Sequence, residues 1–146
     1  MSTASPGATV SLDPAERAGR LHAIARAYVT EGLGKGSFAA IPYHPDVVLR
    51  APLAPGGVHV PLVGRDALRT VWWPPLPQLV QAVRVIDSFV SADLTAAAVE
   101  FHLDISNPPC TLRIIDRFTI NAAGEIVEQE NYFDPRDLTH PGWRTT

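Results

Sequence analysis

Asp116 is the residue whose position in the sequence points most directly to chemistry. Alternate residues along its predicted strand share one face, and these are Leu112, Ile114, Asp116, Phe118 and Ile120. Burying a carboxylate on such an apolar face is costly unless it is hydrogen-bonded, paired with a charge or kept protonated. We therefore expect Asp116 either to satisfy a turn or backbone group in the core or to serve a ligand pocket.

Other polar side chains are predicted to lie near Asp116. On the strand expected at 125–133, Gln129 and Asn131 share a face with Val127 and Phe133, so they can line the same cavity. Tyr28 lies on the apolar face of a predicted helix. Its ring could be plain core packing, or its hydroxyl could reach the pocket.

The elements that position these groups follow from the hydrophobic periodicity. A helix is expected to begin at Asp13-Pro14, with Glu16 in a capping pattern, and to end at Gly32 and Gly34. A helical turn at 38–41 and a helix opening at Gly64 follow. The strand candidates are 47–53, 58–63, 80–90, 95–105, 111–121 and 125–133. Early helices followed by antiparallel strands predict the α+β class. Residues 1–11 are expected to be a flexible arm, and 12–146 a single domain.

Composition narrows the class of partner. The net charge is −3 and Lys35 is the only lysine, so neither nucleic acid nor a membrane is expected as a partner. Cys110 is the only cysteine, and His44, His59 and His102 lack metal-ligand spacing, so no metal and no cofactor are expected. The first residues lack the order of a signal peptide, which predicts a cytoplasmic protein.

Several motifs, in order along residues 15–137, resemble one superfamily. The stretch 107–118, continuing through 123–126 to Tyr132-Phe133, resembles the C-terminal strands of bacterial ketosteroid isomerases. Gly124-Glu-Ile and Asn131-Tyr-Phe-Asp134 are similar to the limonene epoxide hydrolase family and to SnoaL-like polyketide cyclases. The segments 26–29, 43–52 and 64–68 match as well. The resemblance implies the nuclear transport factor 2-like fold, a cone-shaped, curved antiparallel β-sheet with about three helices from the N-terminal half on its concave face.

The resemblance also assigns roles to residues. Asp116 falls on the protonated aspartic acid of the isomerase oxyanion hole, and Tyr28 falls on its tyrosine partner. Tyr43 matches a second tyrosine of that network, while Trp72 replaces a third. The hydrophobic ligand-contacting wall is matched by Val99, Phe101, Leu112, Ile114 and Phe133. The resemblance therefore implies an enzyme that stabilises the enolate of a hydrophobic carbonyl compound during isomerisation, cyclisation or dehydration.

Two departures from the families bear on that activity. The general base of the isomerase corresponds to Ala51 before Pro52, and the catalytic aspartate of the epoxide hydrolase corresponds to Asn131. His59, in the loop before Gly64, could overhang the cavity mouth as a base. The alternative is a non-catalytic ligand-binding or dimerisation domain of the same fold.

The expected partners are a hydrophobic small molecule and a second copy of the chain. The resemblance suggests a homodimer through the convex face of the sheet. Ile115, between Arg113 and Arg117, gives that face the mixed character of a non-obligate interface.

Overall fold

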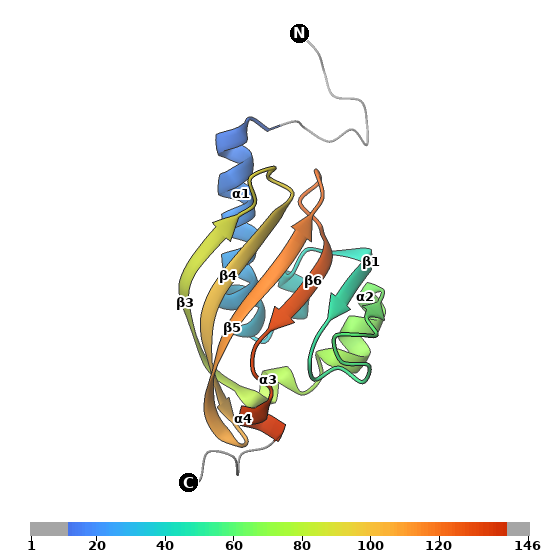
Figure 1. Cartoon of the computed structure of the whole chain (residues 1–146), viewed down its shortest axis with the longest axis vertical. Coiled ribbons are helices and arrows are strands. Elements are labelled where there is room, and N and C mark those ends of the chain that lie inside the picture. Colours follow the sequence, from blue (N-terminus) through green and yellow to red (C-terminus); the bar gives the residue numbers. More distant parts are fainter. Residues whose placement is uncertain (1–11, 140–146) are drawn as a thin grey trace.

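A long helix lies behind a six-stranded sheet in the computed structural model, which describes residues 12–139 (Figure 1). The predicted N-terminal arm, residues 1–11, and the last residues, 140–146, lie outside the described residues. Helix α1 (Pro14–Ala27) begins as predicted, because the Asp13 side chain accepts a hydrogen bond of 2.8 Å from the backbone N–H of Glu16. The chain then continues into a π-helical segment, η1 (Tyr28–Leu33), so Tyr28 is the first residue of the wider turn.

The strands run in the order β2-β1-β6-β5-β4-β3. Their bounds are β1 (Tyr43–Arg50), β2 (Leu62–Val63), β3 (Val80–Val90), β4 (Ala96–Ser106), β5 (Pro109–Ile120) and β6 (Ile126–Tyr132). The strand expected at 58–63 is reduced to two residues, since Pro61 has no N–H to donate to a ladder. The first strand begins at Tyr43, earlier than expected, because Tyr43 pairs with Ile126 of β6.

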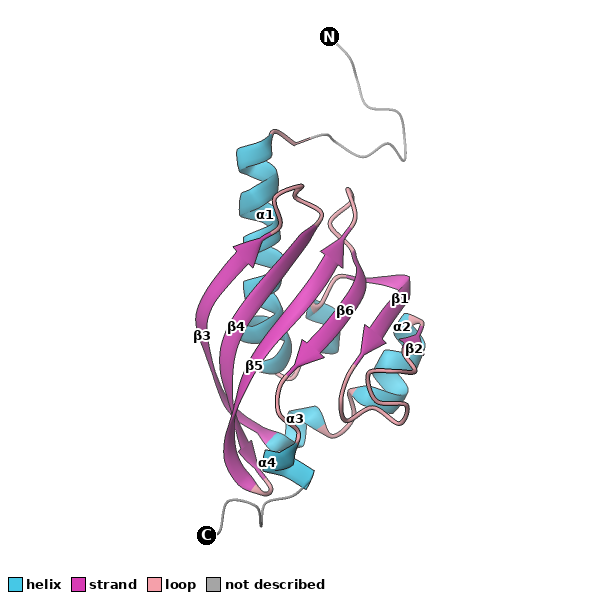
Figure 2. Ribbon diagram, in the orientation of Figure 1, coloured by secondary structure: helices cyan, strands magenta, loops and turns pink. Residues whose placement is uncertain are grey.

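The sheet is mixed, whereas the sequence predicted only antiparallel pairs. Strands β1 and β6 run parallel, and the other neighbours run antiparallel. The reason is the connection after β2. It passes through α2 (Arg65–Ala67), η3 (Leu68–Trp72) and α3 (Leu76–Leu79) to the far edge of the sheet. The meander from β3 to β6 then returns and brings β6 alongside β1. The α+β class and the helices in the N-terminal half are confirmed (Figure 2).

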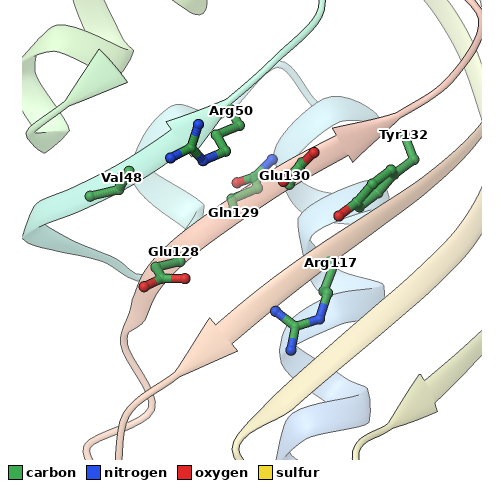
Figure 3. A pocket seen from close by; sticks show the side chains of 7 residues that line it. All are labelled: Val48, Arg50, Arg117, Glu128, Gln129, Glu130 and Tyr132. Carbon is green, nitrogen blue, oxygen red and sulfur yellow. The ribbon is translucent and has the colours of Figure 1, made fainter. Parts of the chain in front are cut away.

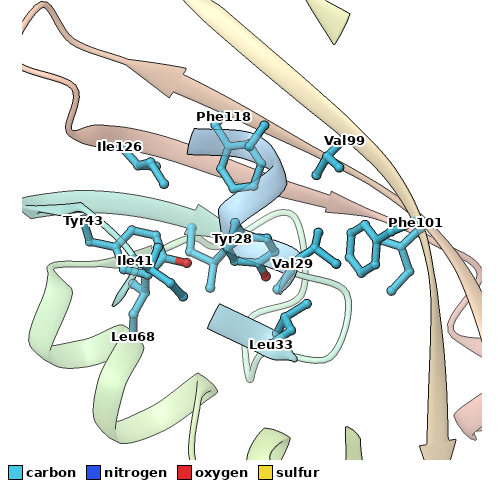
Figure 4. Packing of buried hydrophobic residues seen from close by; sticks show 14 of the residues in the cluster. Tyr28, Val29, Leu33, Ile41, Tyr43, Leu68, Val99, Phe101, Phe118 and Ile126 are labelled. Atoms are coloured by element: carbon cyan, nitrogen blue, oxygen red, sulfur yellow. The ribbon is translucent and has the colours of Figure 1, made fainter. Parts of the chain in front are cut away.

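The core lies between the concave face of the sheet and the helical segments, where α1 contacts β3 and β4. The predicted apolar face of β5 is buried, Asp116 included, and the alternate residues Val99, Phe101, Leu103 and Ile105 of β4 are buried beside it. Figure 4 shows Tyr28 in the middle of this cluster, between Tyr43 on one side and Phe101 on the other. Two short helical segments complete the described chain, η2 (Phe38–Ala40) and α4 (Arg136–Thr139). None of the described helices has the length and apolar character needed to cross a membrane.

Candidate functional site

A cavity of about 170 Å³ opens between the concave face of the sheet and the helical segments. Its walls are largely apolar, and Tyr28 and Asp116 are the ionisable residues among those that line it. Strands β4 and β5 supply one wall, while η3 and α3 supply the opposite one. Leu53 and Val71 line the cavity and are also 47% exposed, so they stand at its mouth. Such a space suits an apolar ligand with a polar group at its inner end.

Asp116 is buried in this wall, with 2% of its surface exposed. Its Oδ1 atom is buried and has no hydrogen-bond partner in the described part of the chain. Burial raises the pKa of Asp116 well above its ordinary value, and hydrogen bonding with Tyr28 opposes this rise. Burial therefore favours the neutral acid, which can donate a hydrogen bond as well as accept one.

Tyr28 brings its hydroxyl to the same place from η1. Its ring packs edge-on against Phe118, with 4.9 Å between the ring centroids, and more loosely against Phe101 at 6.5 Å. Burial raises the pKa of Tyr28 well above its ordinary value, and the nearby Asp116 and Tyr43 raise it further. Tyr28 is therefore held as a phenol, a hydrogen-bond donor next to Asp116.

A chain of hydrogen bonds runs behind the cavity wall. The Tyr43 hydroxyl donates to Oε1 of Gln129 over 2.5 Å, and Nε2 of Gln129 donates to Oδ1 of Asn131 over 3.0 Å. All three residues are buried. Asn131 is the direct cross-strand partner of Asp116, so the chain ends beside the unpartnered carboxyl oxygen.

The structure brings together eight of the thirteen residues proposed from the sequence. The lining of the cavity includes Tyr28, Ala51, Trp72, Leu112, Ile114, Asp116, Asn131 and Phe133. Tyr43 and Gln129 are behind it, in the hydrogen-bonded chain. Val99 and Phe101 are buried in the core and do not line the cavity. His59 is exposed in the β1–β2 connection and is not among the lining residues.

Sequence reasoning missed most of the mouth and the helical wall. Those residues are Leu33, Leu53, Val71, Pro75, Leu76, Leu79 and Leu138. Leu103 and Ile105 also line the cavity, from the buried face of β4. The signal for the helical wall was the pair Leu76 and Leu79, which are spaced to share one face of a helical turn. Pro74, Pro75 and Pro77 surround this pair, and prolines in such positions indicate the end of a helix.

Among the described residues, no group of three or more His, Cys, Asp or Glu side chains could hold a metal ion. The cavity also lacks a basic side chain that could bind a phosphate. The chemistry that this lining supports is hydrogen bonding to one ligand oxygen within an apolar enclosure.

A second hollow, of about 140 Å³, lies on the outer face of β1, β6 and β5 (Figure 3). Its side chains are mainly charged and include Arg50, Arg117, Glu128 and Glu130. Tyr132 also lines this hollow, and its cross-strand partner is Ile115; both side chains are partly exposed. This face therefore combines apolar side chains with charges of both signs.

Comparisons with known proteins agree with this architecture. The family model for the SnoaL-like domain matches residues 25–129. No curated protein matches the sequence. A solved steroid delta-isomerase from Pseudomonas aeruginosa is similar, with a TM-score of 0.60, 22% identity, and coverage of 81% of this chain and 82% of that chain.

Two further solved structures have the same fold. One is SalBIII, an epoxide hydrolase/cyclase-like enzyme in pyran ring formation in polyether salinomycin, with a TM-score of 0.67, 16% identity, and coverage of 86% of this chain and 95% of SalBIII. The other is an NTF2-like protein from Anabaena variabilis, with a TM-score of 0.67, 14% identity, and coverage of 86% and 95%. At these identities the likeness concerns the fold.

Proposed function

The chain belongs to the SnoaL-like domain family, and on that premise we propose that it is an enzyme acting on a small hydrophobic carbonyl compound. The reaction class is isomerisation, aldol-type cyclisation or dehydration through an enolate held by Tyr28 and Asp116. The observation that carries this proposal is Oδ1 of Asp116, a buried carboxyl oxygen without a partner in the described chain, in the wall of an apolar cavity. Buried polar groups are normally hydrogen-bonded, so a ligand group is the partner we infer.

In this proposal the carbonyl oxygen of the ligand lies between the two donors. The neutral acid of Asp116 and the phenol of Tyr28 each donate a hydrogen bond to it. As a water molecule at the cavity mouth takes the proton from the neighbouring carbon, negative charge develops on that oxygen, and both hydrogen bonds strengthen. The apolar surroundings increase the effect, because little water is present to screen the charge.

The similar structures support the reaction class by analogy of fold. One is a steroid delta-isomerase, and another is an epoxide hydrolase/cyclase-like enzyme in pyran ring formation. Fold alone does not fix function. The proposal for this chain therefore depends on Tyr28 and Asp116.

A second candidate function is non-catalytic binding of the same ligand. The observation that favours it is the absence of another carboxylate among the residues lining the cavity, where Ala51 occupies the position expected for a base. Both functions need the two donors to bind a ligand oxygen. They differ in whether the bound ligand exchanges a proton on carbon.

The same proposal includes a homodimer and a cytoplasmic location. Ile115 and Tyr132, with Arg117 and Glu130 beside them, give the outer face the mixed composition of a reversible interface. Charges of both signs on one face can complement themselves across a two-fold axis. A single cysteine, Cys110, agrees with a reducing compartment.

The test is a titration of the native protein with 4-nitrophenol, whose phenolate is detected by absorbance. We expect the phenolate to bind more tightly than neutral cyclohexanone, because the donors are matched to negative charge. Asp116→Leu and Tyr28→Phe should each weaken phenolate binding by about ten- to a hundredfold, as expected for a hydrogen bond to a charged group. Unchanged affinity in both variants would mean that these two residues belong only to the core.

A further inference from the structure

We infer that Asn131 is a third donor to the ligand oxygen, and that Tyr43 and Gln129 are positioning residues that fix which end of its amide points to the ligand. This inference rests on the proposed function, because it concerns the oxygen held by Tyr28 and Asp116. It gives Asn131 a role in ligand binding, and it gives Tyr43 and Gln129 the role of orienting Asn131.

The direction of the hydrogen bonds carries the inference. A tyrosine hydroxyl that donates to Gln129 must meet its carbonyl oxygen, so Oε1 of Gln129 faces Tyr43. The amide nitrogen of Gln129 then faces Asn131 and donates to Oδ1. The carbonyl end of Asn131 is thereby occupied, and its amide nitrogen is the end left for a ligand.

The amide nitrogen of Asn131 donates to no other group in the described part of the chain. Asn131 also lines the cavity, whereas Tyr43 and Gln129 do not. The neighbouring carboxyl oxygen, Oδ1 of Asp116, makes no hydrogen bond to it either, although the two residues are direct cross-strand partners. With Asp116 in its neutral form, two donors thus lie side by side, and a ligand oxygen can accept a hydrogen bond from each.

Burial helps to hold the Asn131 amide in this orientation. Tyr43 and Gln129 are each only 2% exposed, so water does not compete for their hydrogen bonds. Turning the Asn131 amide over would place the N–H groups of Asn131 and Gln129 against each other. The site should therefore select a ligand end that accepts hydrogen bonds, such as a ketone, over an isosteric apolar end.

The probes that test this are cyclohexanone and methylenecyclohexane, which have nearly the same shape but differ in the oxygen. Their affinities are measured by calorimetry for the native protein and for Asn131→Leu, Asn131→Ala and Tyr43→Phe. Asn131→Ala removes the same donor with a smaller side chain, so it covers the case in which the leucine variant does not fold. Tyr132→Phe, on the outer face of the same strand, is the matched control for the loss of a hydroxyl.

We expect both Asn131 variants to lower the affinity for cyclohexanone about two- to tenfold, the range for one hydrogen bond, with little change for methylenecyclohexane. Tyr43→Phe should give a smaller loss in the same direction, and none when Asn131 is already leucine, because it acts through Asn131. Tyr132→Phe should change neither affinity.

Two results overturn the inference, and they are distinguishable. If cyclohexanone binding depends on Tyr28 and Asp116 but not on Asn131 or Tyr43, the third donor is wrong and the proposed function stands. If the native protein binds the two probes equally, no donor acts on the oxygen, and the proposed function fails together with this inference.

Discussion

Asp116 on β5 and Asn131 on β6 face each other as cross-strand partners in the wall of one cavity, yet Oδ1 of Asp116 has no hydrogen-bond partner in the described chain. A buried polar group without a partner lowers the stability of the folded protein by about 1–3 kcal/mol. A ligand that hydrogen-bonds there recovers this energy. The same feature that is unfavourable in the free protein is thus favourable for binding.

The first prediction concerns stability and pH. Because burial raises the pKa of Asp116 in the folded state, the folded protein holds this proton more tightly than the unfolded chain does. The contribution of Asp116 to the free energy of unfolding is therefore fully present below the pKa that this side chain has in the unfolded chain, about 4. It is lost as the pH rises toward the folded pKa, with a limiting slope of about 1.4 kcal/mol per pH unit.

Urea denaturation between about pH 4 and 8 measures this slope. The free energy of unfolding of Asp116→Asn should lack this contribution, so the variant should gain stability relative to the native protein as the pH rises. Parallel pH profiles for the two proteins would contradict a raised pKa at Asp116.

The second prediction concerns ligand size. The cavity of about 170 Å³ is close to an engineered cavity of about 150 Å³ that accommodates benzene. A single six-membered ring should therefore fit, whereas four fused rings should not. We expect a ketosteroid to bind no more tightly than cyclohexanone, although it has more apolar surface.

Trp72 gives this prediction a control, since it forms part of the cavity wall. Trp72→Ala should improve ketosteroid binding relative to cyclohexanone by enlarging the cavity. Tight binding of a ketosteroid to the native protein, measured by the same calorimetry, would show that the cavity opens further than the structure indicates.

Much of this arrangement was predictable from the sequence, because strand periodicity is a local signal. The burial of Asp116 follows from the alternation with Ile114 and Phe118, and the structure confirms that all three are buried. The parallel pairing of β1 with β6 was not predictable in this way. It depends on the path of the chain through α2 and α3, which no local pattern encodes.

The site was predictable only in part for a similar reason. Asp116 and Asn131 belong to regular strands, so their side-chain directions follow from the strand period. Leu53 and Val71 lie in turns and a π-helical segment, where no simple period applies. The direction of the hydrogen bonds from Tyr43 through Gln129 to Asn131 was not predictable from the sequence, because it depends on the positions of three side chains at once.

The third prediction restores a base to the cavity. Ala51 is 1% exposed and lines the cavity, so a carboxylate there would face the bound ring. Ala51→Asp should accelerate the conversion of cyclohex-3-en-1-one into its conjugated isomer by about a hundred- to ten-thousandfold, the usual contribution of general-base assistance. The reaction is followed by ultraviolet absorbance. Ala51→Asn is the isosteric control without a base, and equal rates for the two variants would contradict this position for the base.

The fourth prediction concerns the homodimer. Sedimentation equilibrium at micromolar concentrations should give a dimer for the native protein. Ile115→Arg would place a third positive charge between Arg113 and Arg117 on the outer face and should shift it to monomer. Val63→Arg, on the short edge strand β2, is the matched control and should remain dimeric. A native monomer, or equal dissociation by both variants, would exclude the outer face as the interface.

The central claim is that Tyr28 and Asp116 stabilise an enolate, and proton exchange on carbon tests it most directly. Cyclohexanone is dissolved in D2O with the protein, and the loss of its α-proton signals is followed by nuclear magnetic resonance. We expect the α-protons to exchange faster with the native protein than in buffer alone. Tyr28→Phe and Asp116→Leu should each reduce this acceleration by about a hundred- to thousandfold, or abolish it where the acceleration is smaller than that. If the native protein binds cyclohexanone without accelerating exchange, or if both variants exchange at the native rate, the enolate account is contradicted.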